Sequence, residues 1–455
     1  TAVGASALLA NTSGTSSVAV GHQALDSNTT GSNNTAVGKD SLASNTTGAS
    51  NVAVGTNALE ANTTSSSSTA IGYNSLTANT AVSNTAVGKD SLESNSSGAR
   101  NTAVGADALA ANTTASDNVA VGKAALAANT TGTTNVAVGT YALDANTTAS
   151  NNTAVGYQAL TANTTGASNV AVGRNALLAN TTGGSNTVVG LNAMDTNSTG
   201  SSNTAIGQSA LNSCTVDDNV AVGYHAALNT STGTDNVAVG AYALDANTTG
   251  SDNTALGDNA LGANTTAANN TAVGSAALLT NTTGDQNVAV GFSALKVNTT
   301  GSDNVSVGDR SLLANTTGIR NVAIGRLTLA ANTTASNNTA VGDAALYTNT
   351  SGTSNVGVGF QALYVNTTAS SNTAVGYQAM VTNTTGANNV AIGKDALQMN
   401  TTGAANVAVG LEALEENTTA SYNTAVGYQA LTDATTGANN TAVGHTAAAN
   451  VTTGD

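Results

Sequence analysis

The side chains in this sequence that could serve as nucleophiles, bases or metal ligands are few and widely separated. The three histidines, His22, His225 and His445, all lie just after a glycine of one recurring motif, in distant parts of the chain. A zinc site needs three or four converging ligands, so this spacing does not predict a metal centre. Cys214 is the single cysteine. A reactive thiol needs an accessible, electropositive setting, and we interpret Cys214 as a buried substitution.

A second candidate is the tetrapeptide Val-Gly-Lys-Asp at residues 37–40 and 87–90, which recurs with Ile at residues 392–395. A glycine followed by lysine faintly resembles a phosphate-binding loop, but the upstream glycine and the following helix of that motif are missing. The acids also do not follow the Gly-Gly-x-Gly-x-Asp pattern of calcium-binding β-rolls. We therefore predict no catalytic, cofactor-binding or metal-binding residue, and a protein that is not an enzyme.

The elements around these residues belong to one repeat. A phrase ending in Val-Gly or a close variant occurs 27 times, and 24 of the 26 steps between its glycines are 17 residues long. The two exceptions, Gly72 to Gly88 and Gly207 to Gly223, are 16 residues long. A constant short period is typical of one structural unit that stacks along an axis. We expect residues 1–455 to form a single continuous repeat array.

Each repeat combines a strand-like triplet with one leucine. The triplet is Thr/Val-Ala-Val, as in Thr153-Ala154-Val155, and the leucine follows four residues after the glycine, as in Leu160. β-Branched residues favour strands, so we predict one short strand at the triplet and a second around Ala-Leu. The Leu and Val rows are expected to be buried, and the variable residues just after each glycine to be exposed.

Three further positions report backbone or packing constraints. The motif glycine is invariant in all 27 copies, so either its φ is positive or another backbone passes too close for a Cβ. An asparagine seven residues later, such as Asn163, is replaced only by Cys214, Thr230, Ala434 or Val451. That pattern predicts a buried ladder of side-chain amides. Another asparagine directly before the triplet is expected to bind backbone at a turn.

Composition narrows the function further. The chain has 10 basic and 25 acidic residues, with no basic stripe, so nucleic acid is not an expected partner. No apolar run is long enough to span a membrane, and no signal peptide is recognisable. The sequence begins and stops inside repeats, so we expect a segment of a longer protein without its caps or anchor. One cysteine gives no disulfide framework.

These observations predict an all-β fold, a parallel β-solenoid or β-roll of about 27 coils with 17 residues per coil. At about 4.8 Å per coil the array would be on the order of 130 Å long. Both 16-residue repeats should lose their residue between the ladder asparagine and the next triplet. We expect a homotrimer built around the alanine row Ala36, Ala53, Ala70 and their equivalents. The alternative is that this row points into a narrow single-chain core.

The phrase Asn51-Val52-Ala53-Val54-Gly55, like residues 203–207, resembles the head repeat of YadA-like trimeric autotransporter adhesins. Similar repeats occur in phage tail fibres. The resemblance covers essentially every repeat, although the family repeat is usually shorter than 17 residues and no neck, stalk or anchor is seen. It implies a trimer of left-handed parallel β-rolls that is displayed on a cell surface and binds a host or cell-surface ligand.

The sequence thus favours a non-enzymatic extracellular fibre or adhesin shaft that acts through length, stiffness and multivalent contact. One alternative is an ice- or crystal-surface binder that uses regular threonine rows such as Thr164-Thr165, and another is a phage tail-fibre shaft. Asn-Thr-Thr at Asn28, Asn45, Asn112 and Asn163 is a glycosylation sequon, but buried ladder asparagines could not accept glycans after folding. Scattered tyrosines after the glycines are interpreted as ordinary surface residues, at Tyr73, Tyr157, Tyr224, Tyr377 and Tyr428.

Overall fold

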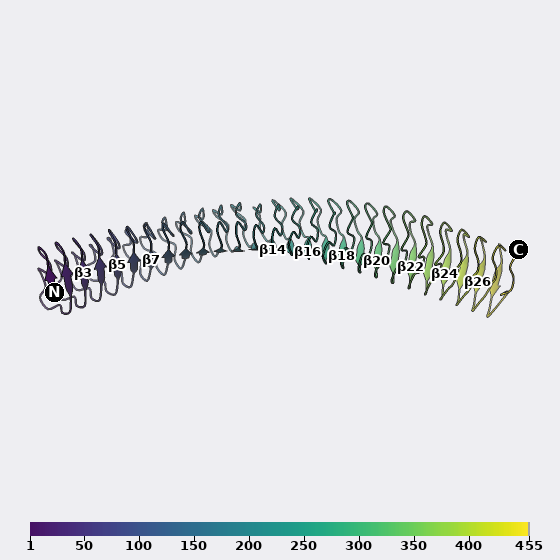
Figure 1. Ribbon diagram of the computed structural model, residues 1–455, viewed down its shortest axis with the longest axis horizontal. Helices are drawn as coiled ribbons and strands as arrows, with labels where there is room; N and C mark the ends of the chain where they lie inside the picture. The colour runs from purple at the N-terminus through teal and green to yellow at the C-terminus, as the bar shows by residue number, and fades with distance from the viewer. Residues whose placement is uncertain (454–455) are drawn as a thin grey trace. The chain divides into compact units, whose positions relative to one another are not determined.

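In the computed structural model, which describes residues 1–453, the chain is a parallel β-solenoid with one strand per coil (Figure 1). No helix occurs among these residues, so the all-β prediction is confirmed. The coils group into two compact units, Thr1–His225 and Ala226–Asp455, each described by itself below.

The strands of the first unit are β1 Ala2–Val3, β2 Val18–Val20, β3 Thr35–Val37, β4 Val52–Val54, β5 Thr69–Ile71, β6 Thr85–Val87, β7 Thr102–Val104, β8 Val119–Val121, β9 Val136–Val138, β10 Thr153–Val155, β11 Val170–Val172, β12 Thr187–Val189, β13 Thr204–Ile206 and β14 Val220–Val222. Those of the second unit are β15 Val237–Val239, β16 Thr254–Leu256, β17 Thr271–Val273, β18 Val288–Val290, β19 Val305–Val307, β20 Val322–Ile324, β21 Thr339–Val341, β22 Val356–Val358, β23 Thr373–Val375, β24 Val390–Ile392, β25 Val407–Val409, β26 Thr424–Val426 and β27 Thr441–Val443.

Within each unit every strand pairs in parallel with the strand of the next coil, and equivalent residues face one another. Ala154 of β10 pairs with Ala171 of β11, for example. Backbone hydrogen bonds continue outside the strands: the N–H of Leu160 donates to the carbonyl of Ala176 in the next coil at 3.0 Å. Because the coils are in register, each side chain of the repeat forms a row parallel to the axis.

The strands turn one side chain inward and two outward. In β10 the middle residue Ala154 is buried, whereas Thr153 and Val155 are half-buried. Successive side chains of a strand point to opposite faces, so a buried alanine forces both neighbours outward. The prediction that the Val row is buried is therefore wrong; Ile71 and Ile392 of this row are 40% and 41% exposed. The Leu row is buried as predicted, with Leu160 fully inaccessible.

The prediction of a second strand around Ala-Leu is also wrong, because this segment is a turn. Its backbone enters the left-handed region at two residues of each coil, as at Gln158 with φ 56° and Leu160 with φ 54°. A third such residue lies in the outer turn, for example Ser168 with φ 61°. A regular strand cannot contain these conformations.

The sequence carries a signal for these turns. The leucine row accepts Met194 and Met380 but never Val or Ile, whereas the strand rows use Val and Ile freely. A β-branched residue with positive φ is a strong outlier. The absence of Val and Ile from an apolar row therefore marks a left-handed turn rather than a strand.

The invariant glycine is required for both of the reasons considered from sequence. Gly156 has φ +138°, and a Cβ added there would lie 2.4 Å from the carbonyl oxygen of Gly173 in the next coil. The same pair of constraints recurs along the row, so no other residue can take its place without moving the neighbouring coil.

Both short coils lose their residue where expected. In the first, the ladder asparagine Asn79 binds the carbonyl of Ala81, two residues on, at 2.8 Å. In an ordinary coil the corresponding bond spans three residues, as from Asn163 to Gly166. Cys214 likewise donates to Val216, two residues on. The deletion is absorbed in the outer turn and leaves the strand register unchanged.

The alanine row that was expected to form a subunit interface lies inside the single chain. Ala36, Ala53 and Ala70 are all 0% exposed. They cannot contact another chain, so this placement of the interface is wrong and the alternative, a narrow single-chain core, is correct. The row must be small because the leucines of the facing turn fill the space inside each coil.

We predict that Gly156→Ala is strongly destabilising, by about 3 kcal/mol, because it combines a strained φ with a backbone clash. The control is Thr165→Ala, at an exposed position of the same coil. Hydrogen exchange measured by mass spectrometry should show faster exchange across residues 150–180 in the first variant only. Equal protection in both variants would contradict the assigned role of the glycine row.

Candidate functional site

The ladder asparagines form a continuous amide chain inside the coils. Asn163 is fully buried, and its Nδ2 donates to Asn146 Oδ1 at 3.0 Å and to the Gly166 carbonyl at 2.9 Å. Its own Oδ1 accepts from Asn180 Nδ2 at 2.9 Å. Both amide hydrogens and the oxygen are therefore satisfied without water, as the predicted ladder requires.

A second asparagine row ties the outer turn to the strand, which confirms its predicted backbone-binding role. The N–H of Asn152, directly before β10, donates to Asn135 Oδ1 in the preceding coil at 3.0 Å. Its Nδ2 donates to the Gly166 carbonyl at 3.0 Å. The same carbonyl accepts from Asn163, so one oxygen holds both rows together.

The ladder is interrupted where the repeat departs from its pattern. Next to the short coil, Asn79 turns its amide to its own outer turn, and Asn62 Oδ1 is buried without a donor. Asn417 Oδ1 is also buried without a donor, because Ala434 stands at the ladder position of the next coil. A buried acceptor without a partner costs about 1–3 kcal/mol, so these two coils are local weak points.

Cys214 occupies a ladder position and is 0% exposed. Its Sγ–H points to the carbonyl of Val216 at 3.5 Å. Burial raises the pKa of the thiol, which favours the unreactive protonated form. The structure thus places Cys214 as a packed substitution, as we interpreted it.

Each histidine lies beside a neighbour of its own. His22 Nδ1 lies 3.8 Å from Asp40 Oδ1, and His225 and His445 stack on Tyr224 and Tyr428 respectively. Within residues 1–453 no three His, Cys, Asp or Glu side chains come together in an arrangement that could hold a metal ion.

The Lys-Asp motifs form local ion pairs rather than anion cradles. Lys39 Nζ lies 3.2 Å from Asp40, Lys394 Nζ lies 2.7 Å from Asp395, and Lys89 contacts Asp90 in the same way. Each lysine is thus partly neutralised by its own neighbour; the lysines are exposed, whereas Asp40 and Asp90 are half-buried and Asp395 is buried.

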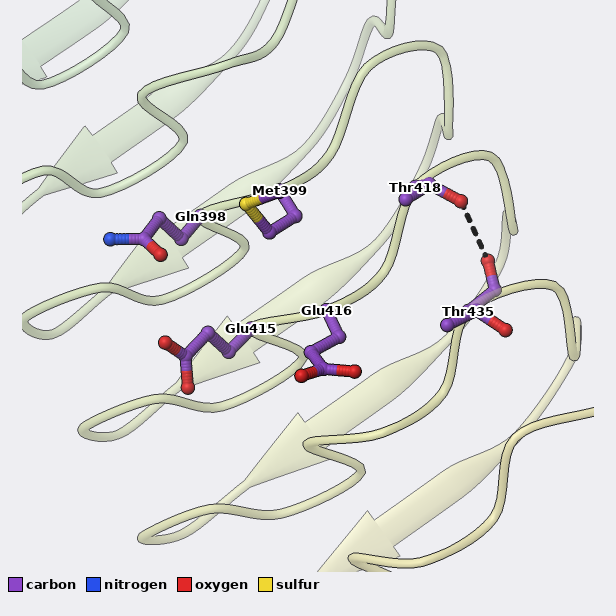
Figure 2. Close-up of a pocket in the computed structure, with 6 residues that line it drawn as sticks. All are labelled: Gln398, Met399, Glu415, Glu416, Thr418 and Thr435. Atoms are coloured by element: carbon purple, nitrogen blue, oxygen red, sulfur yellow. Dashed lines mark hydrogen bonds between the residues drawn. The ribbon is translucent and has the colours of Figure 1, made fainter.

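A hollow of about 400 Å³ lies beside the turns of the coils that contain β24, β25 and β26. Figure 2 shows Met399 and Glu416 on the side of Thr418 and Thr435, and Gln398 and Glu415 turned away from them. Asp395 nearby accepts from Gln398 at 3.0 Å, and Gln429 donates to Glu412 at 2.7 Å. These acids are held by amides and a lysine, and the hollow has no nucleophile paired with a base.

Aromatic side chains pair in neighbouring coils of the second unit. Tyr347 and Tyr364 stack with centroids 5.2 Å apart, and Phe360 and Tyr377 with centroids 5.3 Å apart. The coil period brings equivalent positions together, and in each pair the two aromatics occupy the same position of successive repeats. The sequence interpretation considered these residues singly and missed the pairing.

The two threonine rows of the outer turn differ. The hydroxyl of Thr164 donates to the carbonyl of Thr181 at 3.0 Å, and this bond recurs along the row. Thr165, the next residue, is exposed. Only the second row therefore presents its hydroxyls outward.

A comparison of the chain with known protein families and with curated proteins finds no match. None of the residues that the structure describes forms a helix able to cross a membrane.

We predict that Asn163→Ala costs about 2–4 kcal/mol, because it leaves the buried amides of Asn146 and Asn180 incompletely bonded. Thr165→Ala, two residues away on the surface, is the control and should change stability little.

Conversely, Ala434→Asn should stabilise the second unit by about 1 kcal/mol, because the new side-chain amide donates to Asn417 Oδ1. Urea unfolding followed by circular dichroism measures all three; a destabilising Ala434→Asn would contradict the ladder argument.

A further prediction concerns pH. Burial, followed by the charges of Glu412, Asp395 and Glu416, raises the pKa of Glu415. The ionised carboxylate of Glu415 therefore destabilises the folded state. This destabilisation disappears as the pH falls and the carboxyl group of the folded protein takes up its proton. Glu415→Gln should be more stable than the parent near neutral pH and equal to it below about pH 4.

Proposed function

We propose that this chain is a non-enzymatic extracellular structural fibre or adhesin shaft, which works through stiffness and repeated surface contacts. The observation that carries this proposal is the uninterrupted bonding of coil to coil within each unit. Within each unit every coil is tied to the next by a parallel strand pair and, in most coils, by an asparagine pair. Such an array resists bending and shear along its length.

The distribution of reactive side chains supports the same function. Histidines, lysines, aromatics and most acids occupy turns at the surface, while the interior holds mainly alanine, leucine and asparagine. A surface that repeats at each coil suits many weak contacts made together, whose combined strength greatly exceeds that of one contact.

The proposal includes self-association of the chain. The contact surface is the outer sheet face and not the buried alanine row. We define the outer sheet face as the first and third residues of the strand triplets, such as Thr153 and Val155. No charged residue occurs in these two rows. With about 4.8 Å per strand and about 7 Å between the rows, each unit offers on the order of 400 Å² of this face, a size typical of interaction sites. Identical copies can match it row to row, and a homotrimer is the assembly that we favour.

We predict that Val155→Lys, Val172→Lys and Val189→Lys together abolish self-association, because they place charges on the outer sheet face. Light scattering coupled to gel filtration should report a smaller particle with unchanged circular dichroism. The control places three lysines on the exposed outer turn, at Thr165, Thr182 and Thr199. An oligomer that survives the valine changes, or a parent chain that is monomeric at every concentration, would contradict this assembly. Charges in the alanine row are expected to unfold the coil instead.

The adhesive role is tested with beads that carry the chain at high or low density. We expect binding to cell surfaces that rises steeply with density, because many contacts act together. Two results together would instead support an ice- or crystal-surface binder. The beads would not bind cells at any density, and the chain in solution would alter the shape of growing ice crystals and produce thermal hysteresis. The exposed Thr165 row is the observation that favours this alternative. A phage tail-fibre shaft would show the same stiffness and would differ in its attachment partner.

A further inference from the structure

The chain carries two recurring classes of glycosylation sequon, and the structure separates them; Asn229, Asn304 and Asn450 begin single sequons outside both classes. The abundant class, Asn-Thr-Thr and its variants, uses the ladder asparagines. A second class, Asn-Asn-Thr, begins one residue before the strand-leading asparagine and occurs at Asn33, Asn151, Asn269, Asn337 and Asn439. All five of these asparagines are exposed, with φ between 60° and 64°.

The ladder asparagines cannot react while the coil is intact. The acceptor atom in N-glycosylation is the amide nitrogen, and in Asn28 both hydrogens of this nitrogen are bonded, to Asn11 Oδ1 and the Gly31 carbonyl at 3.0 Å each. Asn28 is also 0% exposed. The same holds for Asn163 and the other interior ladder asparagines.

The Asn-Asn-Thr class has the opposite geometry. Asn33 lies in the outer turn, where its N–H is anchored to the carbonyl of Thr15 at 2.9 Å. Asn34 points inward and is buried, and Thr35 is half-exposed at the start of β3. This alternation puts the acceptor amide and the hydroxyl two residues later on the outside together, which are the two groups that define the sequon.

We propose that Asn33, Asn151, Asn269, Asn337 and Asn439 are acceptor sites for N-linked sugar on the folded protein. The donor is a sugar activated as a glycosyl diphosphate. The Asn Nδ2 forms a bond to the anomeric carbon while the bond from this carbon to the phosphate oxygen breaks. The diphosphate departs with the electron pair, and the amide nitrogen loses one proton to a base of the transferase.

The attached sugars would project from the outer turn, away from the buried rows and next to the first row of the outer sheet face. The two buried asparagine rows use Asn28 and Asn34 but not the amide of Asn33, so modification leaves the coil-to-coil bonds intact. This inference does not depend on the fibre function, since it rests on accessibility alone.

The test uses the purified, folded chain with a soluble N-glucosyltransferase that recognises Asn-x-Ser/Thr, and UDP-glucose as donor. Mass spectrometry should find hexose at Asn33 and its four Asn-Asn-Thr equivalents and none at interior ladder asparagines. Peptides released from the same chain by proteolysis serve as the control for the enzyme and should be labelled at Asn-Thr-Thr as well. Labelling of Asn28 or Asn163 in the folded chain, or none at Asn33 and its equivalents while the peptides react, overturns the proposal.

Natural variation in the repeat supplies matched variants. Other coils carry Val where Thr35 stands, so Thr35→Val should keep the fold and abolish labelling at Asn33 alone. In the reverse direction, Asn388 is exposed with φ 62° but is followed by Asn389-Val390. Val390→Thr should create one additional site there. Failure of this gain in a correctly folded variant would show that exposure and sequon are insufficient on this surface.

Discussion

The close approach of successive backbones at the glycine row is the constraint on which the rest of the structure depends. A Cβ at Gly156 would lie 2.4 Å from the next glycine carbonyl, so the coils can be this near only where no side chain intervenes. That distance lets the strands pair in register, brings the asparagine amides within hydrogen-bond reach and closes the core around one leucine per coil. Each coil therefore depends on its neighbour for stability, as in other repeat proteins.

Sequence periodicity predicts much of this arrangement, because residues at the same repeat position share one structural environment and therefore accept the same few residue types. The buried leucines, the two asparagine roles, the glycine constraint and the location of both deletions all follow from substitution within rows. The prediction that the Val row is buried was wrong, because the hydrophobicity of a residue does not show whether its side chain points into the coil or out of it. In the three-residue strand β10, the buried Ala154 forces both neighbouring side chains outward. The alanine row was mistaken for a subunit interface because a row of small residues is equally compatible with a narrow core and with a close contact between chains.

The surface was harder to predict than the core. Stacking of Tyr347 on Tyr364 depends on coil spacing as well as composition. The environment of Glu415 depends on acids that lie one coil away and in its own turn. The two kinds of sequon read alike as strings, and only the burial of Asn28 and the exposure of Asn33 distinguish them. Accessibility, which a linear pattern does not contain, determines their chemistry.

The direction of the asparagine bonds gives each unit an electrical polarity. In every ladder pair the later residue donates to the earlier one, as Asn180 does to Asn163 and Asn163 to Asn146. The side-chain amide dipoles therefore point the same way and add, as peptide dipoles do in a helix. Their positive ends face the N-terminal coils and their negative ends the C-terminal coils. The two ends of a ladder segment are thus electrostatically different, and partners of opposite charge would prefer opposite ends.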